Sequence, residues 1–354
     1  MLRNIDFMSW KLTGLEMDRK KQMLYIRADM NEVIATGHIM RCLAIADAAR
    51  DLGRDTTFIL ADTQAVELIR ERGHRSIVLD TRWNQMDMEL PALKKVIAEY
   101  GIRKLLVDSY SVTPEYLQDL SKQVEVAYID DLDAFIYPVH TLIRYTGNWE
   151  ESLYEERYRE TKLLLGLEYA PLRRAFANCS RKVIPPRAEN LLLLSGGTDR
   201  FYVIESLLKE IRKEQYKSID VICGKYYEEY AQMCARYHQY ENIHFHQGIN
   251  NVEDYMKKAD VAVSAGGTTL YELSACGTPV ISYSFADNQL DNVKRFQKDN
   301  LISYAGDVRY DKAIEKILHD LDLYMEDMPL RMQQSRRMQA LIDGKGALRI
   351  AKVL

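Results

Sequence analysis

Short apolar runs alternate with amphipathic segments along most of the chain. Residues 23–26 form the first run, and after a polar loop the apolar residues Ile39, Leu43 and Ala46 recur at helical spacing. Short runs between helical segments of about ten residues are typical of βαβ units with a parallel sheet. Because crossovers between parallel strands are right-handed, the pattern predicts a doubly wound sheet.

The same alternation occurs in each half of the chain. In the first half, the predicted strands are residues 23–26, 56–60, 76–79, 104–108 and 124–129, and the predicted helices are 39–53, 65–73, 90–100 and 114–123. In the second half, the predicted strands are residues 191–194, 219–223, 242–245, 261–263 and 280–283, and the predicted helices are 201–213, 226–240, 252–258, 269–275, 291–298 and 311–321. Residues 142–165 resemble an irregular charged connection, and residues 328–354 a final amphipathic segment. The predicted fold class is therefore α/β, with two doubly wound, Rossmann-like domains facing a cleft.

A proline pair marks the expected boundary between the two halves. Pro185 and Pro186 lie in a polar stretch and give the strongest linker signal in the chain. The length of 354 residues also agrees with two domains of about 150 residues each. The expected division is an N-terminal extension at 1–22, a first domain at 23–184, a second domain at 185–338, and a C-terminal helix at 339–354 that can return to the first domain.

Composition narrows the class of protein. Hydrophobic residues make up 47% and charged residues 28% of the chain, and the formal net charge is -4. This balance argues against nucleic acid or an anionic membrane surface as the main partner. No apolar run approaches the roughly 20 residues of a membrane span, and residues 1–22 lack the apolar core of a secretory signal. The five scattered cysteines form no CxxC motif, so the sequence favours a cytoplasmic protein without a disulfide framework.

His38 lies where the first predicted strand and loop meet a helix start. Ligands bind at this edge of open α/β sheets, and a helix start offers free N–H groups and a partial positive charge to an anion. A histidine there can act as a general base near neutral pH. The alternative is a helix-start residue whose hydrogen bond has only a structural role. The stretch by itself favours neither interpretation.

Carboxylates follow several predicted strands of the first half. Asp29, Asp108 and the pair Asp130–Asp131 all fall at strand ends, and Tyr110 follows one of them. Because the carboxyl ends of parallel strands meet at one edge, we expect these groups on the edge that carries His38. The Asp130–Asp131 pair fits either an accessory role in a site or a helix cap.

A glycine pair followed by two threonines opens a helix in the second half. In Gly266-Gly267-Thr268-Thr269, backbone N–H groups and hydroxyls can approach a phosphate, and Glu272, one turn later, can accept both hydroxyls of a ribose. The segment is neither a Walker loop nor a GxGxxG fingerprint. The segment that contains Gly196 and Gly197 is a second loop of the same kind. The alternative is that both pairs only make tight turns between a strand and a helix.

The sequence gives no convincing metal site. His244 and His246 lie on one face of a predicted strand, but no third ligand is evident nearby. We therefore expect neither a metal nor a cofactor.

A set of motifs in a fixed order resembles a known enzyme family. The motifs are Arg27-Ala28-Asp29, residues 36–43, residues 165–173, residues 195–199, residues 265–272, Ala286-Asp287-Asn288-Gln289 and residues 343–347. Together they cover the chain from residue 23 to the C-terminus. They resemble the UDP-2,4-diacetamido-2,4,6-trideoxy-β-L-altropyranose hydrolases of pseudaminic acid biosynthesis, which are related to spore-coat polysaccharide biosynthesis proteins. More distantly, the chain is similar to the transferase that adds N-acetylglucosamine in peptidoglycan synthesis.

The resemblance implies a glycosyltransferase-B-like fold that binds UDP in the interdomain cleft. It also implies hydrolysis of a UDP-linked deoxy-diacetamido sugar, with UDP and the free sugar as products. Under this hypothesis His38 is the general base for the attacking water, or holds that water in line. The other catalytic candidates, which would orient it, are Asp29, Tyr110 and Asp131. The candidate substrate-binding residues are Gly37, Arg41, Gly196, Gly197, Gly266, Gly267, Thr268, Thr269, Glu272, Asn288 and Gln289.

Two other functions fit the same motifs. A glycosyltransferase would share the UDP site and differ only in what attacks the anomeric carbon. A non-catalytic component of polysaccharide assembly would bind the nucleotide sugar without reacting. UDP release in the absence of an acceptor distinguishes the hydrolase from the transferase.

Overall fold

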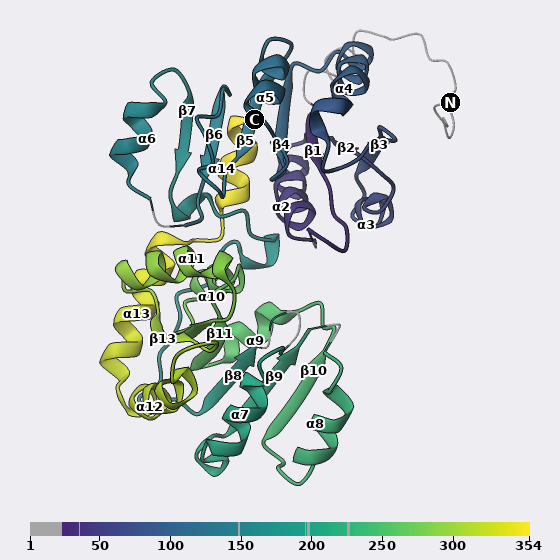
Figure 1. Cartoon of the computed structure of the whole chain (residues 1–354). Helices are drawn as coiled ribbons and strands as arrows, with labels where there is room; N and C mark the ends of the chain where they lie inside the picture. The colour runs from purple at the N-terminus through teal and green to yellow at the C-terminus, as the bar shows by residue number, and fades with distance from the viewer. Residues whose placement is uncertain (1–22, 35, 148, 195, 197–198, 225–226) are drawn as a thin grey trace. The chain divides into compact units, whose positions relative to one another are not determined.

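The computed structural model describes residues 23–34, 36–147, 149–194, 196, 199–224 and 227–354. Within these residues, short buried strands alternate with helices and form two sheets (Figure 1). The predicted extension at residues 1–22 lies outside the described part of the chain.

The first sheet has seven strands in the order β3-β2-β1-β4-β5-β6-β7. Its elements are β1 Leu24–Ala28, α2 Gly37–Asp51, β2 Thr56–Leu60, α3 Val66–Glu71, β3 Arg75–Val78, α4 Met86–Tyr100, β4 Lys104–Asp108, α5 Pro114–Ser121, β5 Glu125–Ile129, β6 Thr141–Arg144, α6 Glu151–Arg157 and β7 Lys162–Leu165. The pairs from β3 to β5 are parallel. Every residue of β1 and β2 is buried, as expected for strands with helices on both faces.

The second sheet has six parallel strands in the order β10-β9-β8-β11-β12-β13. Its elements are β8 Asn190–Leu194, α7 Val203–Glu210, β9 Ser218–Cys223, α8 Tyr230–Tyr237, β10 Ile243–Gln247, α9 Val252–Lys258, β11 Val261–Ala265, α10 Thr269–Cys276, β12 Val280–Ser284, α11 Asp287–Lys298, β13 Ser303–Asp307, α12 Ala313–Glu326, α13 Met328–Leu341 and α14 Gly346–Val353. In both sheets, the first strand along the chain lies beside the fourth, which is the doubly wound order.

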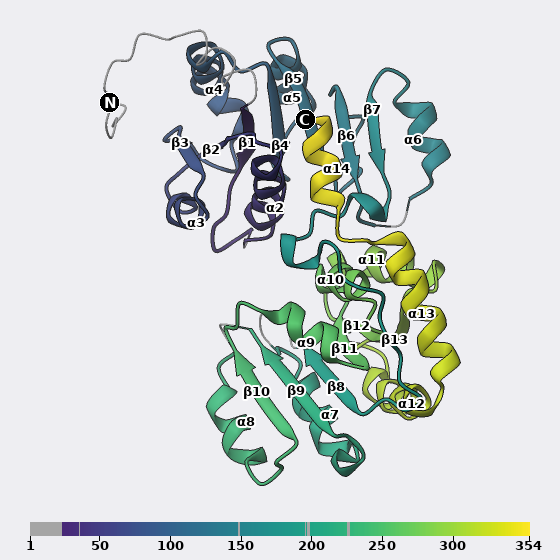
Figure 2. The same cartoon turned by 180° about the vertical axis from the view of Figure 1, so that it is seen from behind.

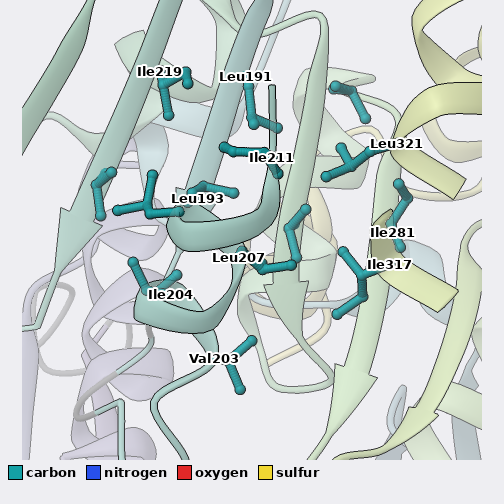
Figure 3. Packing of buried hydrophobic residues seen from close by; sticks show 14 of the residues in the cluster. Leu191, Leu193, Val203, Ile204, Leu207, Ile211, Ile219, Ile281, Ile317 and Leu321 are labelled. Carbon is teal, nitrogen blue, oxygen red and sulfur yellow. The ribbon is translucent and has the colours of Figure 1, made fainter. Parts of the chain in front are cut away.

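Alternate residues of the second sheet build its main apolar layer. Leu191 and Leu193 of β8 point into a buried cluster with α7 and α12, as Figure 3 shows. Side chains along a strand alternate between the two faces, so the buried Leu192 packs on the opposite face. The continuous apolar run of β8 therefore follows from burial on both faces.

Local signals place several helix ends. Thr113 caps α5, where its hydroxyl accepts a hydrogen bond from the N–H of Tyr116 at 3.0 Å, and Pro114 follows it. Helix α10 ends at Gly277, whose φ of 69° lies in the left-handed region that glycine tolerates. The sequence predicted this break.

Residues 142–165 differ from the prediction. The expected irregular connection contains β6, α6 and β7, and it widens the first sheet to seven strands. These strands have four residues each, which is too short to give a clear alternation. The edge strand β13 was also missed, because its sequence Ser-Tyr-Ala-Gly-Asp has little β-strand character.

The predicted amphipathic segment at residues 328–354 consists of α13 and α14, so the C-terminal helix begins at Gly346 rather than at residue 339. They are separated around Gly344, whose φ is 75° and where an added Cβ would lie 2.1 Å from the carbonyl oxygen of Phe176. Only glycine fits this close approach. Helix α14, drawn in yellow in Figures 1 and 2, then ends the chain.

Contacts divide the chain into two compact units. One holds the described residues up to Leu142, with Glu160–Lys162 and Ile350–Leu354, and the other holds Ile143–Arg159 and Leu163–Arg349. This division differs from the predicted boundary after residue 184, because residues 163–184 belong to the second unit. For example, the ammonium group of Lys182 donates hydrogen bonds to the carbonyls of Lys257 and Ala259 at the end of α9. The last residues of α14 belong to the first unit, where the carbonyl of Ala351 accepts a hydrogen bond from Arg54 at 2.7 Å.

Candidate functional site

The first sheet reverses its winding direction between β1 and β4. Such a switch point leaves a crevice outside the carboxyl ends of the two strands, where α/β proteins bind ligands. The chain leaving β1 leads to the start of α2, and His38 is the second residue of that helix. Asp108 is the last residue of β4, at the carboxyl end of that strand. The topology therefore brings His38 and Asp108 to the same crevice, although they lie 70 positions apart in the sequence.

His38 and Asp108 form a buried hydrogen-bonded pair. The Nδ1 atom of His38 lies 2.6 Å from Oδ1 of Asp108, and the two residues are 4% and 1% exposed. Burial by itself would raise the pKa of Asp108, but the Arg41 guanidinium and the His38 ring hold that pKa well below its usual range. Because an ionised carboxylate only accepts, Nδ1 of His38 donates the proton. With Nδ1 engaged by Asp108, Nε2 of His38 has no protein partner among the described residues, and it is the ring nitrogen left to contact a ligand.

Arg41 joins two carboxylates of this site. Its Nε and Nη2 donate to the two oxygens of Asp108 at 2.6 and 2.5 Å, and its Nη1 donates to Asp131 at 2.6 Å. Two parallel bonds to one carboxylate fix its orientation as well as its charge. Arg41 was predicted to be a substrate-binding residue. In the structure its guanidinium is engaged by Asp108 and Asp131.

Tyr110 covers one side of the imidazole. Its ring meets the His38 ring edge-on, with centroids 4.4 Å apart and an interplanar angle of 76°. Its hydroxyl donates to Asp131 at 2.8 Å, and burial together with the Asp131 charge raises the pKa of Tyr110 well above its usual range. The predicted residues His38, Tyr110 and Asp131 thus lie together, although their catalytic roles stay a prediction.

Asp29 belongs to a different network. One of its oxygens accepts a bond from Arg27 at 2.5 Å and the other from the N–H of Ala61 at 2.8 Å. Arg27 also pairs with the fully buried Glu89 of α4 at 2.6 Å. These contacts tie β1 to its neighbours inside the domain. The carboxylate that pairs with the His38 imidazole is Asp108, which ends β4, and not Asp29, which follows β1.

The second sheet has its own switch point, between β8 and β11. Gly266 follows β11, and an added Cβ there would lie 2.2 Å from Cγ1 of Val293, so α11 packs directly against the backbone. The Asn292 side chain of α11 donates to the carbonyls of Gly266 and Gly267 at 2.9 and 3.4 Å. Asn292 accepts in turn from the hydroxyl of Tyr271 at 2.6 Å. The glycine loop is thus held by its carbonyl groups.

The N–H groups that open α10 take no part in these contacts. Those of Gly267, Thr268 and Thr269 have no hydrogen-bond partner within the part of the chain that the structure describes. Thr268 is exposed and Thr269 is half-buried. An unpaired helix start with hydroxyls beside it suits an anionic ligand such as a phosphate.

Glu272 follows in the first turn of α10. Burial raises the pKa of its carboxyl to about 7, although the Arg173 guanidinium opposes this shift and Glu253 adds to it. Nε of Arg173 lies 3.9 Å from Oε1 of Glu272, and Nη2 of Arg173 lies 3.2 Å from Oε2 of Glu253. One arginine thus faces two carboxylates, and the charge of Glu272 depends on it.

The remaining predicted residues differ in their exposure. Asn288 is exposed in the first turn of α11, and Oε1 of Gln289 accepts a bond from the N–H of Phe285 at 3.0 Å. Gly196 is exposed after β8 with a φ of 69°, and Gly197 lies outside the described residues. Gly37 is exposed as the first residue of α2.

His246, one of the two histidines of β10, is held by contacts with its neighbours. Nε2 of His246 lies 2.9 Å from Asp220, and its Nδ1 lies 3.3 Å from the hydroxyl of Tyr255, so both ring nitrogens have partners. Among the described residues, no group of three or more His, Cys, Asp or Glu side chains is arranged to hold a metal ion.

Comparisons with known proteins identify the class of fold. A model of the family described as Glycosyl transferases group 1 matches residues 187–337, which is less than half of the chain. Among solved structures, MurG of Acinetobacter baumannii has a TM-score of 0.68 at 12% identity over 94% of this chain and 98% of that one. Anabaena Alr3699/HepE, solved with UDP and glucose, has a TM-score of 0.56 at 12% identity over 94% and 98%. The protein therefore has two parallel-sheet α/β domains of the glycosyltransferase-B type, and the predicted fold class is confirmed.

A curated relative adds a narrower likeness. The chain is 22% identical over 337 residues to the spore coat polysaccharide biosynthesis protein SpsG of Bacillus subtilis strain 168, covering 90% of this chain and 93% of that protein. The predicted likeness to spore-coat polysaccharide proteins is confirmed at this level. The narrower family of UDP-sugar hydrolases stays a prediction. No helix among the described residues has the length and apolar character needed to cross a bilayer.

Proposed function

We propose that the protein is an enzyme of surface polysaccharide biosynthesis that transfers a glycosyl group from a UDP-sugar to a hydroxyl acceptor. The match to Glycosyl transferases group 1 and the glycosyltransferase-B fold support glycosyl transfer. The likeness to SpsG supports a polysaccharide pathway. The neighbour solved with UDP and glucose supports a uridine nucleotide as the donor.

The His38–Asp108 pair is the observation that carries the proposal. Nε2 of His38 accepts the proton of the attacking hydroxyl, and the ionised Asp108 stabilises the imidazolium that forms. Arg41 fixes Asp108, and Tyr110 limits the tilt of the ring. A domain that only bound a nucleotide sugar would need no such base. This favours catalysis over a purely binding role.

The second domain has the groups that a nucleotide diphosphate requires. The unpaired N–H groups of Gly267 to Thr269 bind the departing phosphates and stabilise the charge that develops on them. The carboxylate of Glu272 accepts the hydroxyls of the ribose. In this proposal, the second domain binds the nucleotide and the first domain carries out the proton transfer.

Hydrolysis is the second candidate function. The same base can activate water, and the ordered motifs resemble the hydrolases that release UDP and a 2,4-diacetamido-2,4,6-trideoxy sugar. The chemistry at His38 is then unchanged, and only the nucleophile differs.

A panel of UDP-sugars, assayed with and without hydroxyl acceptors, separates the candidates. Transfer gives UDP only when an acceptor is present, together with a glycosylated product. Hydrolysis gives UDP and free sugar without an acceptor. The Asp108→Asn variant should lose either activity, and GDP- and TDP-sugars serve as donor controls. If UDP-sugars bind but none releases UDP with any acceptor or with water, the proposed enzyme activity is wrong.

A further inference from the structure

Two cysteines that lie far apart in the sequence meet in the second unit. Cys179 follows the short turn Arg174–Phe176, and Cys276 is the last residue of α10. Their sulfur atoms are 4.0 Å apart, within hydrogen-bond range for sulfur. Cys179 is partly exposed, whereas Cys276 is buried. The Cys179 thiol is therefore accessible to a small solute, whereas the Cys276 thiol is buried next to it.

The segments that carry the two thiols are fixed to one side chain. Nε2 of Gln339 donates to the carbonyls of Ser180 and Ala275 at 3.0 and 3.3 Å. Its Oε1 accepts from the N–H of Lys182 at 3.1 Å. Each cysteine is thus next in the chain to a residue held by Gln339, which keeps the sulfur atoms close without a rearrangement of either segment.

The charges around the pair make the two thiols unequal. The hydrogen bond with Cys276 lowers the pKa of Cys179 to about 7, and the Lys257 ammonium acts in the same direction against burial and Glu253. The same bond and burial raise the pKa of Cys276, while Lys257 and Lys182 oppose that rise. Cys179 is therefore the thiol that ionises near neutral pH, and the thiolate is the reactive form.

The other buried cysteines have no such surroundings. Burial raises the pKa of Cys223 to about 12 and also raises the pKa of Cys42. Cys234 is partly exposed, as Cys179 is, and its charge adds to the rise in the pKa of Cys223. Because no hydrogen bond between Cys234 and Cys223 is found among the described residues, Cys234 provides a control for an exposed thiol that lies near another cysteine without such a bond.

We propose that Cys179 and Cys276 form a site of reversible oxidation, with a peroxide as the oxidant. The Cys179 thiolate attacks one peroxide oxygen, the O–O bond breaks, and Cys179 becomes a sulfenic acid as hydroxide or alkoxide leaves and takes up a proton. The Cys276 sulfur then attacks the Cys179 sulfur, the S–O bond breaks and water leaves. With hydrogen peroxide, two thiols and one peroxide give one disulfide and two water molecules.

The disulfide would tie residue 179 to the end of α10. That helix begins with Thr269 and carries Glu272 in its first turn. Oxidation would therefore restrain the helix that opens the candidate nucleotide loop. The oxidation itself does not depend on the proposed function.

Limiting hydrogen peroxide, followed by thiol counting and peptide mass spectrometry, tests the proposal on the full chain. The wild type should lose two of its five free thiols and give a linked Cys179–Cys276 peptide that dithiothreitol releases. Cys276→Ser should stop at a sulfenic acid on Cys179, which dimedone captures. Cys179→Ser should give neither product, and Cys234→Ser should behave as the wild type.

A time course on the wild type keeps the test independent of variant folding. Dimedone labelling of Cys179 should rise before the linked peptide accumulates. Retention of all five thiols, a disulfide between other cysteines, or labelling of Cys234 in preference to Cys179 would each overturn the proposal.

Discussion

The two switch points share one topology but are filled in different ways. At the first, between β1 and β4, charged side chains neutralise one another, with His38, Asp108 and Arg41 in direct contact. At the second, between β8 and β11, glycines and threonines leave backbone N–H groups unpaired within the described residues. A proton-transfer group needs fixed partners that set its protonation state, whereas an anion needs unpaired donors. The comparison supports the proposal that the first site carries out proton transfer and the second binds the nucleotide.

The largest expected effect is a loss of turnover at the first site without a loss of nucleotide affinity at the second. His38→Ala should lower turnover by roughly 10²–10⁴-fold, because general-base catalysis contributes about that much. Nucleotide affinity should stay nearly unchanged, because the proposed UDP contacts lie in the other domain. Steady-state kinetics and calorimetry with UDP measure the two quantities on the same preparation.

His38→Gln provides the matched control for the His38→Ala variant, since it keeps a polar side chain without a base. An equal loss in both variants supports proton transfer. If either variant weakens UDP binding as much as it lowers turnover, the proposed division between the domains is wrong.

Glu272→Ala should have the opposite signature. A lost charge-assisted hydrogen bond costs about 1.5–3 kcal/mol, which is roughly tenfold or more in UDP affinity. Turnover at saturating donor should change little, because Glu272 does not touch the reacting atoms in this proposal. Calorimetry with UDP is the measurement, and the exposed Glu315 of α12 offers a control substitution, Glu315→Ala. An unchanged dissociation constant would remove Glu272 from the nucleotide site.

The glycines of the two sites should respond differently to alanine. At Gly266 a Cβ would lie 2.2 Å from Val293, and overpacking of this kind costs about 1–3 kcal/mol of unfolding free energy. At Gly37 nothing lies within 4 Å of an added Cβ, so Gly37→Ala should leave stability unchanged or raise it by up to about 1 kcal/mol. Denaturant unfolding of both variants gives the comparison, and equal destabilisation would contradict the close approach at Gly266.

The sequence reveals the candidate binding site more fully than the candidate catalytic one. Gly266 to Glu272 are contiguous, so a glycine pair, two hydroxyls and a carboxylate can be recognised along one helix start. The partner of His38 lies 70 residues away on another strand. Strand-end position alone did not distinguish Asp108 from Asp29, because both follow buried strands. Only the pairing of β1 with β4, and the use of Asp29 by Arg27, decides between them.

The short strands of the first sheet were missed for a related reason. β6 and β7 have four residues each, and their pairing depends on contacts that no local pattern encodes. The strongly apolar strand β8 was predicted to within one residue. Helix α4 was predicted with the correct end, but it begins four residues before its predicted start. Elements whose burial is fixed by distant residues are therefore the ones that a single sequence does not reveal.

The smallest expected effect is a pH dependence confined to the binding site. The pKa of Glu272 is raised to about 7, so its carboxyl is charged above that pH and neutral below it. UDP affinity should therefore fall as the pH drops through 7, because the neutral acid loses its charge-assisted bonds to the ribose. The terminal phosphate of UDP titrates near roughly pH 6, so the Glu272→Gln variant measures the pH dependence that comes from the phosphate alone.

Two neighbouring residues should shift the pH at which UDP affinity falls. Arg173→Gln should move this pH upward, because Arg173 opposes the rise in the pKa of Glu272. Glu253→Gln should move it downward, because Glu253 adds to that rise. Calorimetric titrations from pH 5.5 to about 8.5 test all four proteins, and a wild-type profile that matches Glu272→Gln would show that this carboxylate does not bind the nucleotide.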